Sequence, residues 1–424
     1  MRVLCCRPRR GLSRTVRPSF RDSRFALLVA GQTVNSVGGW ASAIVLWGFA
    51  AYRFDASSYA VSVTIICWAA PPALLSPVLG VYIDRIGPKA ATVTGYCGAA
   101  CAALGLAAAR SLTELAVAAA AYGCARALAG PAASALPPRI VAAEDLLAAN
   151  ALLGAAASAG QVAGPLAASA ALALSGFPAA FIVDAASYMI GVLVVAPLPL
   201  GPAPAAPAQD AAPDAATHTH WSRQLSEGLR LVARDHAVRL VIVVSAAVTF
   251  TSAAFLVVEP LYARHVLHRP PSQFALFEAA AGTGAVLAGL VISRTGSRLT
   301  GGKTLMASAA GYGLAACLFT GTTWVPAAYT GAFLWGAAGS VFGAVAVTRL
   351  QQVAPVHAHG RVMSISATLQ SWTETIALPL GGVTLAALGV RPGALALAGV
   401  ALAAGLVGLA IVAARPSGHV SRVT

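Results

Sequence analysis

The sequence is poor in charged residues. Asp, Glu, Lys and Arg make up 10% of its 424 residues, whereas a soluble chain carries roughly a quarter. Lysine occurs only twice, at Lys89 and Lys303. The net charge of +14 comes from basic residues in short segments between apolar runs, which leaves no basic face on a soluble domain. The composition therefore excludes an ordinary soluble protein and gives no support to a nucleic-acid partner.

The signatures of enzymes and of cofactor or metal sites are also missing. The chain has no Gly-Lys-Ser/Thr phosphate loop, no His/Cys/carboxylate cluster with metal spacing and no nucleophile-base pair. Its seven cysteines give no disulfide framework, because five lie inside apolar runs and Cys5 and Cys6 lie in an arginine-rich tail. We expect neither an enzyme nor a cofactor or metal. Any energy that the protein uses must then come from an ion gradient or from a solute's own gradient.

Long apolar runs dominate what the chain does contain. Hydrophobic residues make up 58% of it, and the mean hydropathy is +0.75. The first run is too long for a signal peptide, and eleven more runs follow near the length of about 20 residues that a membrane helix needs. The sequence therefore predicts an all-α membrane protein with twelve transmembrane helices, at residues 25–52, 59–83, 90–109, 112–136, 150–174, 177–200, 238–258, 272–293, 303–320, 324–348, 363–388 and 393–413.

The distribution of Lys and Arg predicts the orientation. If the N-terminus is cytoplasmic, 22 of the 28 basic residues fall in cytoplasmic segments, five fall in outer loops, and Arg126 lies inside a span. An excess of Lys and Arg marks the cytoplasmic side of a membrane protein. We therefore expect both termini in the cytoplasm.

Five segments follow from this pattern. Residues 1–24 and 414–424 are cytoplasmic tails, and residues 25–200 and 238–413 form two six-helix bundles. The segment between the bundles, residues 201–237, begins as an Ala/Pro-rich linker. It continues with apolar residues at helical spacing opposite charged ones, which predicts an amphipathic helix on the inner membrane surface.

A charged stretch breaks the chain between the second and third runs. Gly80, Asp84, Arg85, Gly87 and Lys89 place an acid, two bases and two glycines within less than three helical turns. Glycines let neighbouring backbones approach closely, and opposite charges at a membrane surface favour a latch between helix ends. The alternative is a charged loop that only stops membrane insertion.

The two halves of the chain repeat each other. The run Gly289-Leu-Val-Ile-Ser293-Arg294-Thr-Gly296 has the spacing of the charged stretch 209 residues later, with Ser293 in place of the acid. Gly164-Pro165 in the fifth run is echoed by Pro379-Leu-Gly-Gly382 in the eleventh. Two echoes in register with the helices predict two parallel six-helix repeats, which in transporters enclose a substrate site near the bilayer midplane.

The charged stretch, the span count and the repeat together resemble the major facilitator superfamily of secondary transporters. The match to its loop signature is G-x-x-x-D-R-x-G-x-K, with Pro88 where that family usually has Arg. Three further stretches resemble a bacterial exporter branch that includes enterobactin-type and macrolide efflux proteins: Leu136-Pro-Pro-Arg-Ile-Val141, Glu227-Gly-Leu-Arg230 and Gly360-Arg-Val-Met363. The resemblance implies the major facilitator fold and a multi-pass location in the bacterial inner membrane.

The fifth run carries a second family motif. Gly160-x-x-x-Gly164-Pro165 resembles the antiporter motif of exporters, although Ala168 and Ser169 replace the two glycines that usually follow. The alternative is tight helix packing alone, because small residues four positions apart permit close contact and a proline bends the helix.

Charged residues inside the spans need a reason, because a charge at mid-membrane costs roughly 2.5–3.5 kcal/mol on insertion scales. Arg126-x-x-x-Gly130 in the fourth span resembles a family motif in which the arginine faces the cavity and contributes to coupling. The alternative is a structural arginine bound to a backbone carbonyl.

Polar stripes run along two other spans. Ser366, Gln370 and Glu374 recur every fourth residue and share one face of the eleventh span. Such a stripe suits a water-filled cavity with Glu374 as a proton-coupling residue, or else a polar seam against the second span. Gln32 and Asn35 give the first span a similar stripe.

Three further acidic residues lie in or at the ends of the spans, and their positions allow more than one role. Glu278, near the outer end of the eighth span, is a second candidate proton site or part of an outer gate. Asp184 in the sixth span is a candidate for coupling or for a structural hydrogen bond. Glu259 ends the predicted seventh span, and we expect it to be solvated at the outer face.

The sequence thus predicts a proton-coupled exporter of an amphipathic small molecule, such as a drug, siderophore or secondary metabolite, working as a monomer in the lipid bilayer by alternating access. The alternatives are an uptake carrier or uniporter of the same fold and, from another class, a membrane-embedded enzyme or lipid-handling protein. We also expect Asp84 to bind Arg361, at the start of the eleventh span, only while the cytoplasmic side is shut.

Overall fold

The structure of the protein is a computed structural model that describes residues 23–142, 146–200, 236–295, 301–353 and 359–414. These ranges contain twelve long α-helices, one short 3₁₀ helix and no β-strand. The helices of the first half are α1 (Ser23–Arg53), α2 (Ser58–Ile86), α3 (Pro88–Ala108), α4 (Leu112–Ser134), η2 (Pro137–Arg139), α5 (Leu146–Leu174) and α6 (Phe177–Val195). Those of the second half are α8 (His236–His265), α9 (Pro271–Thr295), α10 (Gly302–Gly321), α11 (Val325–Val353), α12 (His359–Leu388) and α13 (Val390–Ala413).

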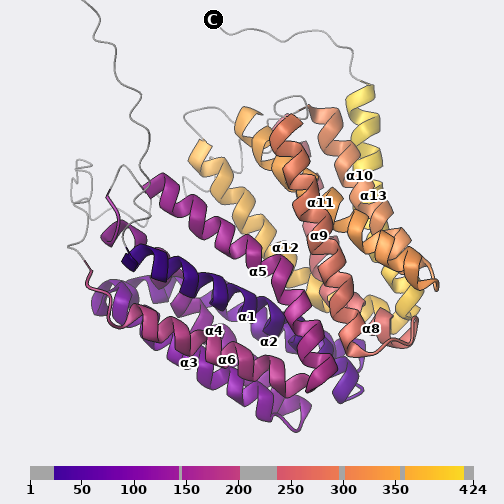
Figure 1. Ribbon diagram of the computed structural model, residues 1–424. Coiled ribbons are helices and arrows are strands. Elements are labelled where there is room, and N and C mark those ends of the chain that lie inside the picture. Colours follow the sequence, from indigo (N-terminus) through magenta and orange to yellow (C-terminus); the bar gives the residue numbers. More distant parts are fainter. Residues whose placement is uncertain (1–22, 143–145, 201–235, 296–300, 354–358, 415–424) are drawn as a thin grey trace, which may run out of the picture.

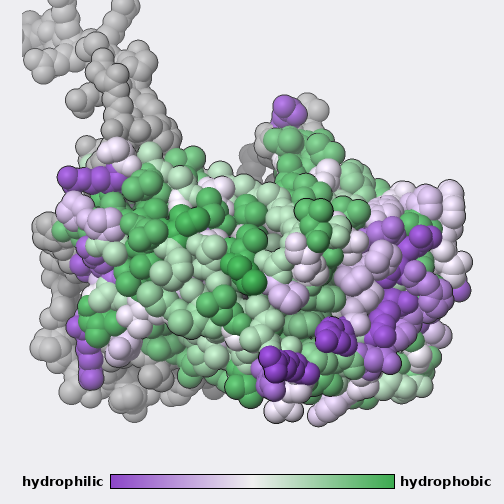
Figure 2. Space-filling view, turned by 60° about the horizontal axis from the view of Figure 1, so that its bottom comes forward, coloured by the Kyte–Doolittle hydropathy of each residue, from purple (hydrophilic) through white to green (hydrophobic). Residues whose placement is uncertain are grey.

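Most of these helices are suited to a bilayer. Eleven of them are long and apolar enough to cross a membrane within the described residues. The twelfth, α12, has a similar length but carries the polar stripe that ends at Glu374. Figure 2 shows a broad hydrophobic surface with hydrophilic residues gathered toward its margins. Exposed side chains such as Leu174, Leu193 and Val117 belong to the apolar surface of the molecule, as expected of a protein whose solvent is lipid.

The two halves repeat the same packing. Helix α1 packs on α5 and α6 as α8 packs on α12 and α13, and α3 packs on α4 and α6 as α10 packs on α11 and α13. The α2–α4 pair likewise corresponds to α9–α11. Figure 1 shows the first half (indigo to magenta) beside the second (orange to yellow). The predicted fold of twelve helices in two parallel repeats is confirmed.

The halves meet along α2–α12, α5–α9 and α1–α8. We call the end of the bundle that holds Ser23 and Ala413 the terminal end, and the opposite one the far end. At the far end, Arg264 Nη2 lies 2.8 Å from Asp55 Oδ1, and Ser58 Oγ donates to the Gly382 carbonyl at 2.8 Å. Toward the terminal end the two bundles diverge (Figure 1). The far end is therefore the closed one.

The ends of several helices differ from the predicted ones. Helix α5 begins at Leu146 rather than at residue 150, and α8 continues to His265 rather than ending at 258. The predicted amphipathic helix within 201–237 and the two tails fall almost entirely outside the described residues. The boundaries of the two predicted bundles stay predictions.

The charged stretch turns the chain from α2 into α3. Gly87 has φ +83° and ψ 148°, a backbone conformation that L side chains rarely adopt. Pro88 is the first residue of α3, a position where its fixed φ and missing N–H are tolerated, which explains its presence where the family usually has Arg. Lys89 Nζ donates to the Leu198 carbonyl at 2.9 Å, tying α3 to the chain after α6. Asp84 and Arg85 are exposed.

Candidate functional site

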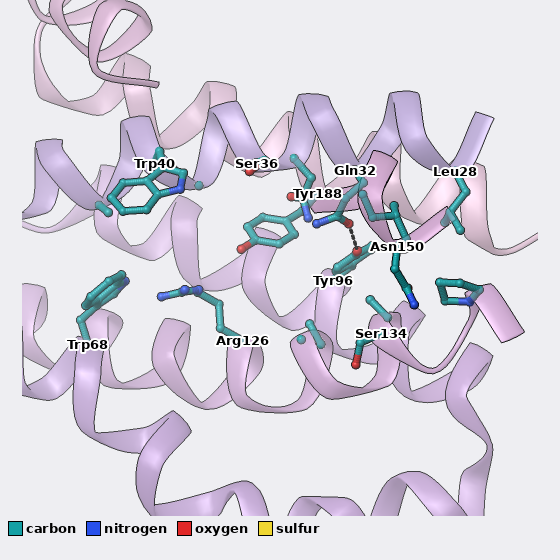
Figure 3. Close-up of a pocket in the computed structure, with 18 residues that line it drawn as sticks. Leu28, Gln32, Ser36, Trp40, Trp68, Tyr96, Arg126, Ser134, Asn150 and Tyr188 are labelled. Carbon is teal, nitrogen blue, oxygen red and sulfur yellow. Dashed lines mark hydrogen bonds between the residues drawn. The ribbon is translucent and has the colours of Figure 1, made fainter. Parts of the chain in front are cut away.

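A cavity of about 450 Å³ lies within the first half and extends toward the terminal end, where Leu28, Pro137 and Asn150 line it. Its size falls in the range of about 300–1,000 Å³ typical of small-molecule sites. All six helices of that half contribute to its wall. Figure 3 labels the side chains that characterise it, which are Leu28, Gln32, Ser36, Trp40, Trp68, Tyr96, Arg126, Ser134, Asn150 and Tyr188. Gln32 and Asn35, the predicted stripe of α1, are both on this wall.

Arg126 is the basic residue of the cavity. Its guanidinium carbon lies 4.7 Å from the centroid of the Trp68 ring and 6.0 Å from that of Tyr122. Cations within about 6 Å of an aromatic face are attracted to it. Among the described residues Arg126 makes no hydrogen bond and no ion pair within 4.0 Å. The predicted alternative, an arginine held by a backbone carbonyl, is not what the described part of the chain contains.

Asp184 of α6 lies behind the cavity and is fully buried. Tyr122 Oη donates to Asp184 Oδ2 at 2.6 Å, and Ser187 Oγ lies 3.4 Å from Oδ1. Arg126 is close enough to act on the carboxylate electrostatically. Hydroxyl donors and a nearby cation are what a buried carboxylate requires. This geometry is that of a structural hydrogen-bond centre joining α4 to α6, and a coupling role for Asp184 remains a proposal.

The antiporter-like motif holds α5 against α1. A Cβ on Gly164 would lie 2.5 Å from Trp40 Cβ, and one on Gly160 would lie 2.7 Å from the Ser36 carbonyl oxygen. Both distances are shorter than real side chains allow, so only glycine fits there. Pro165 lies inside α5, as Pro379 lies inside α12. The packing role is thus directly visible, and the glycines also place Trp40 in the cavity wall.

A second cavity, of about 490 Å³, lies between the halves. It is lined by α5, α9 and α11, and Glu278 is its acidic residue. Trp40 lines this cavity as well as the first. The two candidate sites are therefore neighbours with one shared wall.

The structure corrects the prediction for Glu259. We expected a solvated residue beyond the end of its helix, but α8 continues for two more turns and the side chain is 2% exposed. Its carboxyl group interacts with that of Glu278, and its Oε1 has no hydrogen-bond partner among the described residues. Tyr312 and Trp335 lie beside this pair, with their rings 5.4 Å apart. Two carboxylates in such contact repel each other, and no cation of the described residues forms an ion pair with either of them.

The three polar residues of the α12 stripe differ in how far they are buried. Ser366 is buried, and Gln370 Nε2 donates to Ser366 Oγ at 3.1 Å. Glu374 is exposed. Gly381, two turns further along the same face, packs on Ala254 of α8. Glu374 therefore lies on the face of α12 that packs on α8 two turns further along the helix.

Several of the predicted site residues form no ion pair with one another in the described residues. Arg126 acts on Asp184, Tyr122 and Tyr188, and in the described residues it forms no ion pair with Glu374. Asp84 likewise forms no ion pair with a described side chain, and the side chain of Arg361 lies outside the described residues. No group of three or more His, Cys, Asp or Glu in the described ranges could hold a metal ion.

Comparison with known proteins decides the family. A model of the Major Facilitator Superfamily matches residues 28–268 and again residues 240–423. The chain belongs to the Major Facilitator Superfamily. A comparison with curated proteins found no match. The two family matches together cover nearly the whole chain, in agreement with the repeat seen in its packing.

Solved structures of transporters share this major facilitator fold. The nucleoside transporter NupG has a TM-score of 0.70 at 13% identity, over 93% of this chain and 100% of that one. The peptide transporter POT in complex with sulfate has a TM-score of 0.69 at 15% identity, over 92% and 94%. An inward-facing, unoccupied bacterial homologue of the human lysosomal transporter Spinster has a TM-score of 0.66 at 14% identity, over 93% and 96%. At such identities the likeness concerns the fold.

Sequence reasoning missed several residues of these sites. Trp40, Trp68 and Tyr188 look like ordinary apolar positions until tertiary packing turns them toward Arg126. Glu259 had a usable signal, because Pro260, Leu261 and Tyr262 continue the apolar run beyond it. A span placed a few residues later would have put this acid inside the membrane.

Proposed function

We propose that this member of the Major Facilitator Superfamily is a secondary transporter that exports an amphipathic small molecule in exchange for protons. The observation that carries the proposal is the cavity around Arg126, which extends toward the terminal end while the far end is closed. A cavity that one side of the membrane reaches, inside a two-bundle protein, is what alternating access requires.

The orientation follows from the basic residues. The excess of Lys and Arg at the terminal end favours a cytoplasmic location for it, and under this proposal the structure is an inward-open state. An exporter loads its substrate in this state. The cavity of mixed aromatic, amide and cationic character suits an amphipathic solute such as a drug, a siderophore or a secondary metabolite.

Carboxyl groups supply the proton sites of the proposal. Glu278 borders the cavity between the halves. Together with Glu259 it forms a buried pair of carboxyl groups that no described cation neutralises. Glu374 is an exposed acid of α12. A group that must release and rebind a proton in each cycle needs contact with water in at least one state, and the proposal assigns this contact to the cavity beside Glu278 and to the exposed side chain of Glu374. Export itself is supported by the Gly160–Gly164–Pro165 motif and the resemblance to the exporter branch.

Everted membrane vesicles test the proposal. With an acidic interior, a transported compound is expected to accumulate inside and to release protons, which acridine orange reports as a rise in fluorescence. Collapsing the pH gradient with nigericin is expected to abolish accumulation. Accumulation that is independent of the gradient would indicate a uniporter, and loss of compound from acid-loaded vesicles would indicate uptake into cells.

The same assay separates the candidate proton sites. We expect Glu374→Gln to abolish gradient-driven transport while leaving substrate binding measurable, if Glu374 carries the proton. If that variant still pumps against a gradient, Glu374 has a packing role and the Glu259–Glu278 pair carries coupling alone.

A further inference from the structure

The cavity of the first half contains hydrogen-bond donors without acceptors. A guanidinium group has five N–H donors and no acceptor. None of the N–H groups of the Arg126 guanidinium donates a hydrogen bond to a described residue. Trp68 Nε1, next to it, is a buried donor that also lacks a partner among the described residues. Figure 3 shows Arg126 reaching into the cavity beside Trp68. Buried donors are costly when they are left unpaired, so this position calls for an acceptor from outside the chain.

Asp184 does not fill this need. It lies beyond 4.0 Å from the Arg126 nitrogens, is fully buried, and receives hydrogen bonds from Tyr122 and Ser187. Its charge offsets part of the field of Arg126 from behind, but the donors on the cavity side stay unused. A cation balanced at a distance binds an anion more weakly than a bare one, which suits a carrier that has to release its ligand.

Aromatic rings form much of the remaining wall. Trp68 and Trp40 flank the Arg126 side, and the rings of Tyr96 and Tyr188 lie 5.5 Å apart between that side and the Asn150 end of the cavity. Flat apolar groups gain from stacking on such rings. At the other end, Gln32 and Asn150 provide amides for polar substituents, with Gln32 Oε1 already accepting from Tyr96 Oη at 3.2 Å.

We propose that this cavity binds a planar aromatic anion, namely an aromatic carboxylate, sulfonate or phenolate. The acid group of the ligand accepts hydrogen bonds from Arg126, and the aromatic ring of the ligand lies against the tryptophan and tyrosine side chains of the wall. The second cavity does not share this preference, because its charged residue is Glu278 and its described lining holds no Lys or Arg. The inference rests on the proposed transport function for its meaning, but binding at equilibrium needs neither transport nor a gradient.

Four probes of similar size test the inference on the purified full chain in detergent. Naphthalene-2-sulfonate is aromatic and anionic, naphthalene-2-sulfonamide is aromatic and neutral, 2-naphthylmethylammonium is aromatic and cationic, and cyclohexanesulfonate is anionic without a ring. Isothermal titration calorimetry gives the four dissociation constants. We expect naphthalene-2-sulfonate to bind at least about tenfold more tightly than each of the other three, as a charge-assisted hydrogen bond and stacking predict.

Variants assign the selectivity to residues. Arg126→Gln is expected to remove the preference for the sulfonate over the sulfonamide, Arg126→Lys to keep part of it, and Trp68→Leu to weaken both aromatic probes. Arg110→Gln is the matched control, since Arg110 is exposed just before the helix that carries Arg126. Circular dichroism and gel filtration establish that each variant is folded. If Arg126→Gln does not fold, Arg126→Lys replaces it as the variant that tests the role of Arg126.

Three results would overturn the inference: equal affinity of wild-type protein for the sulfonate and the sulfonamide, no binding of the sulfonate, or an unchanged preference in folded Arg126→Gln. Failure of binding alone would leave vesicle transport of another compound intact. Failure of vesicle transport with intact binding would reject the proposed export and not the ligand class.

Discussion

The two halves of this transporter share one packing plan but bury opposite kinds of polar cluster. In the first half, Arg126 and Asp184 offset each other, and the hydroxyl of Tyr122 completes the cluster. In the second half, Glu259 and Glu278 meet without a described cation beside them. A repeat thus conserves helix contacts while leaving the buried charges free to diverge. The balanced cluster suits a substrate site, and the acidic pair suits a proton site.

The first test of this contrast is stability. Asp184→Asn removes the charge opposite Arg126 and one strong acceptor of Tyr122, so we expect it to cost about 2 kcal/mol. Glu259→Gln removes repulsion between two carboxyl groups, so we expect unchanged or increased stability. Thermal unfolding in detergent, followed by circular dichroism, measures both. Equal destabilisation by the two variants would show that the clusters are not different in kind.

The second test concerns how α5 positions the first cavity. Gly164→Ala would bring a methyl group onto Trp40 Cβ, and overpacking of this kind costs typically 1–3 kcal/mol. Because Trp40 would shift, binding of naphthalene-2-sulfonate is also expected to weaken. Gly154→Ala on the same helix is the control, since nothing lies within 4 Å of its added Cβ. An equal effect of both changes would mean that α5 tolerates movement of α1.

The third and smallest effect concerns the ends of the halves. The first repeat carries Asp84 where the second has Ser293, so any latch on the terminal end is single. In this structure, in which the bundles diverge toward the terminal end, Asp84 is exposed, as expected if its partner binds only when that side is shut. Asp84→Asn is therefore expected to favour the inward-open state by about 1.4 kcal/mol, or tenfold, without unfolding the protein.

Spin-label distances between the terminal ends of α2 and α12 report this shift. Ser293→Ala is the matched change in the second repeat and is expected to leave the distances unchanged. If Asp84→Asn alters neither the distances nor transport, the residue serves only to fix topology during insertion.

Much of the fold could be predicted from the sequence, because it rests on local signals. Apolar runs locate the helices, and the spacing that Gly87 and Gly164 share with the second repeat reveals the internal symmetry. Helix ends are less certain, since α8 continues past Glu259 through residues that a length rule assigns to a loop. The wall side chains Gln32 and Asn35 were found because a polar stripe in an apolar helix needs a wet surface.

Contacts between helices could not be predicted. Arg126 stacks on Trp68 of α2, and Glu259 meets Glu278 of α9, and neither partner is fixed by spacing along the chain. Which acid an arginine approaches depends on helix rotation, and here it is Asp184 rather than Glu374. Sequence reasoning identified most of the unusual residues but could not say which of them are in contact.

The most direct test of the division between the halves compares two transport modes in proteoliposomes. Counterflow of labelled naphthalene-2-sulfonate needs substrate binding and alternating access, whereas accumulation under a pH gradient also needs the proton site. We predict that Glu278→Gln keeps counterflow near the wild-type rate but loses at least about tenfold in accumulation, and that Arg126→Gln loses both. Normal accumulation by Glu278→Gln, or normal counterflow by Arg126→Gln, would contradict the account.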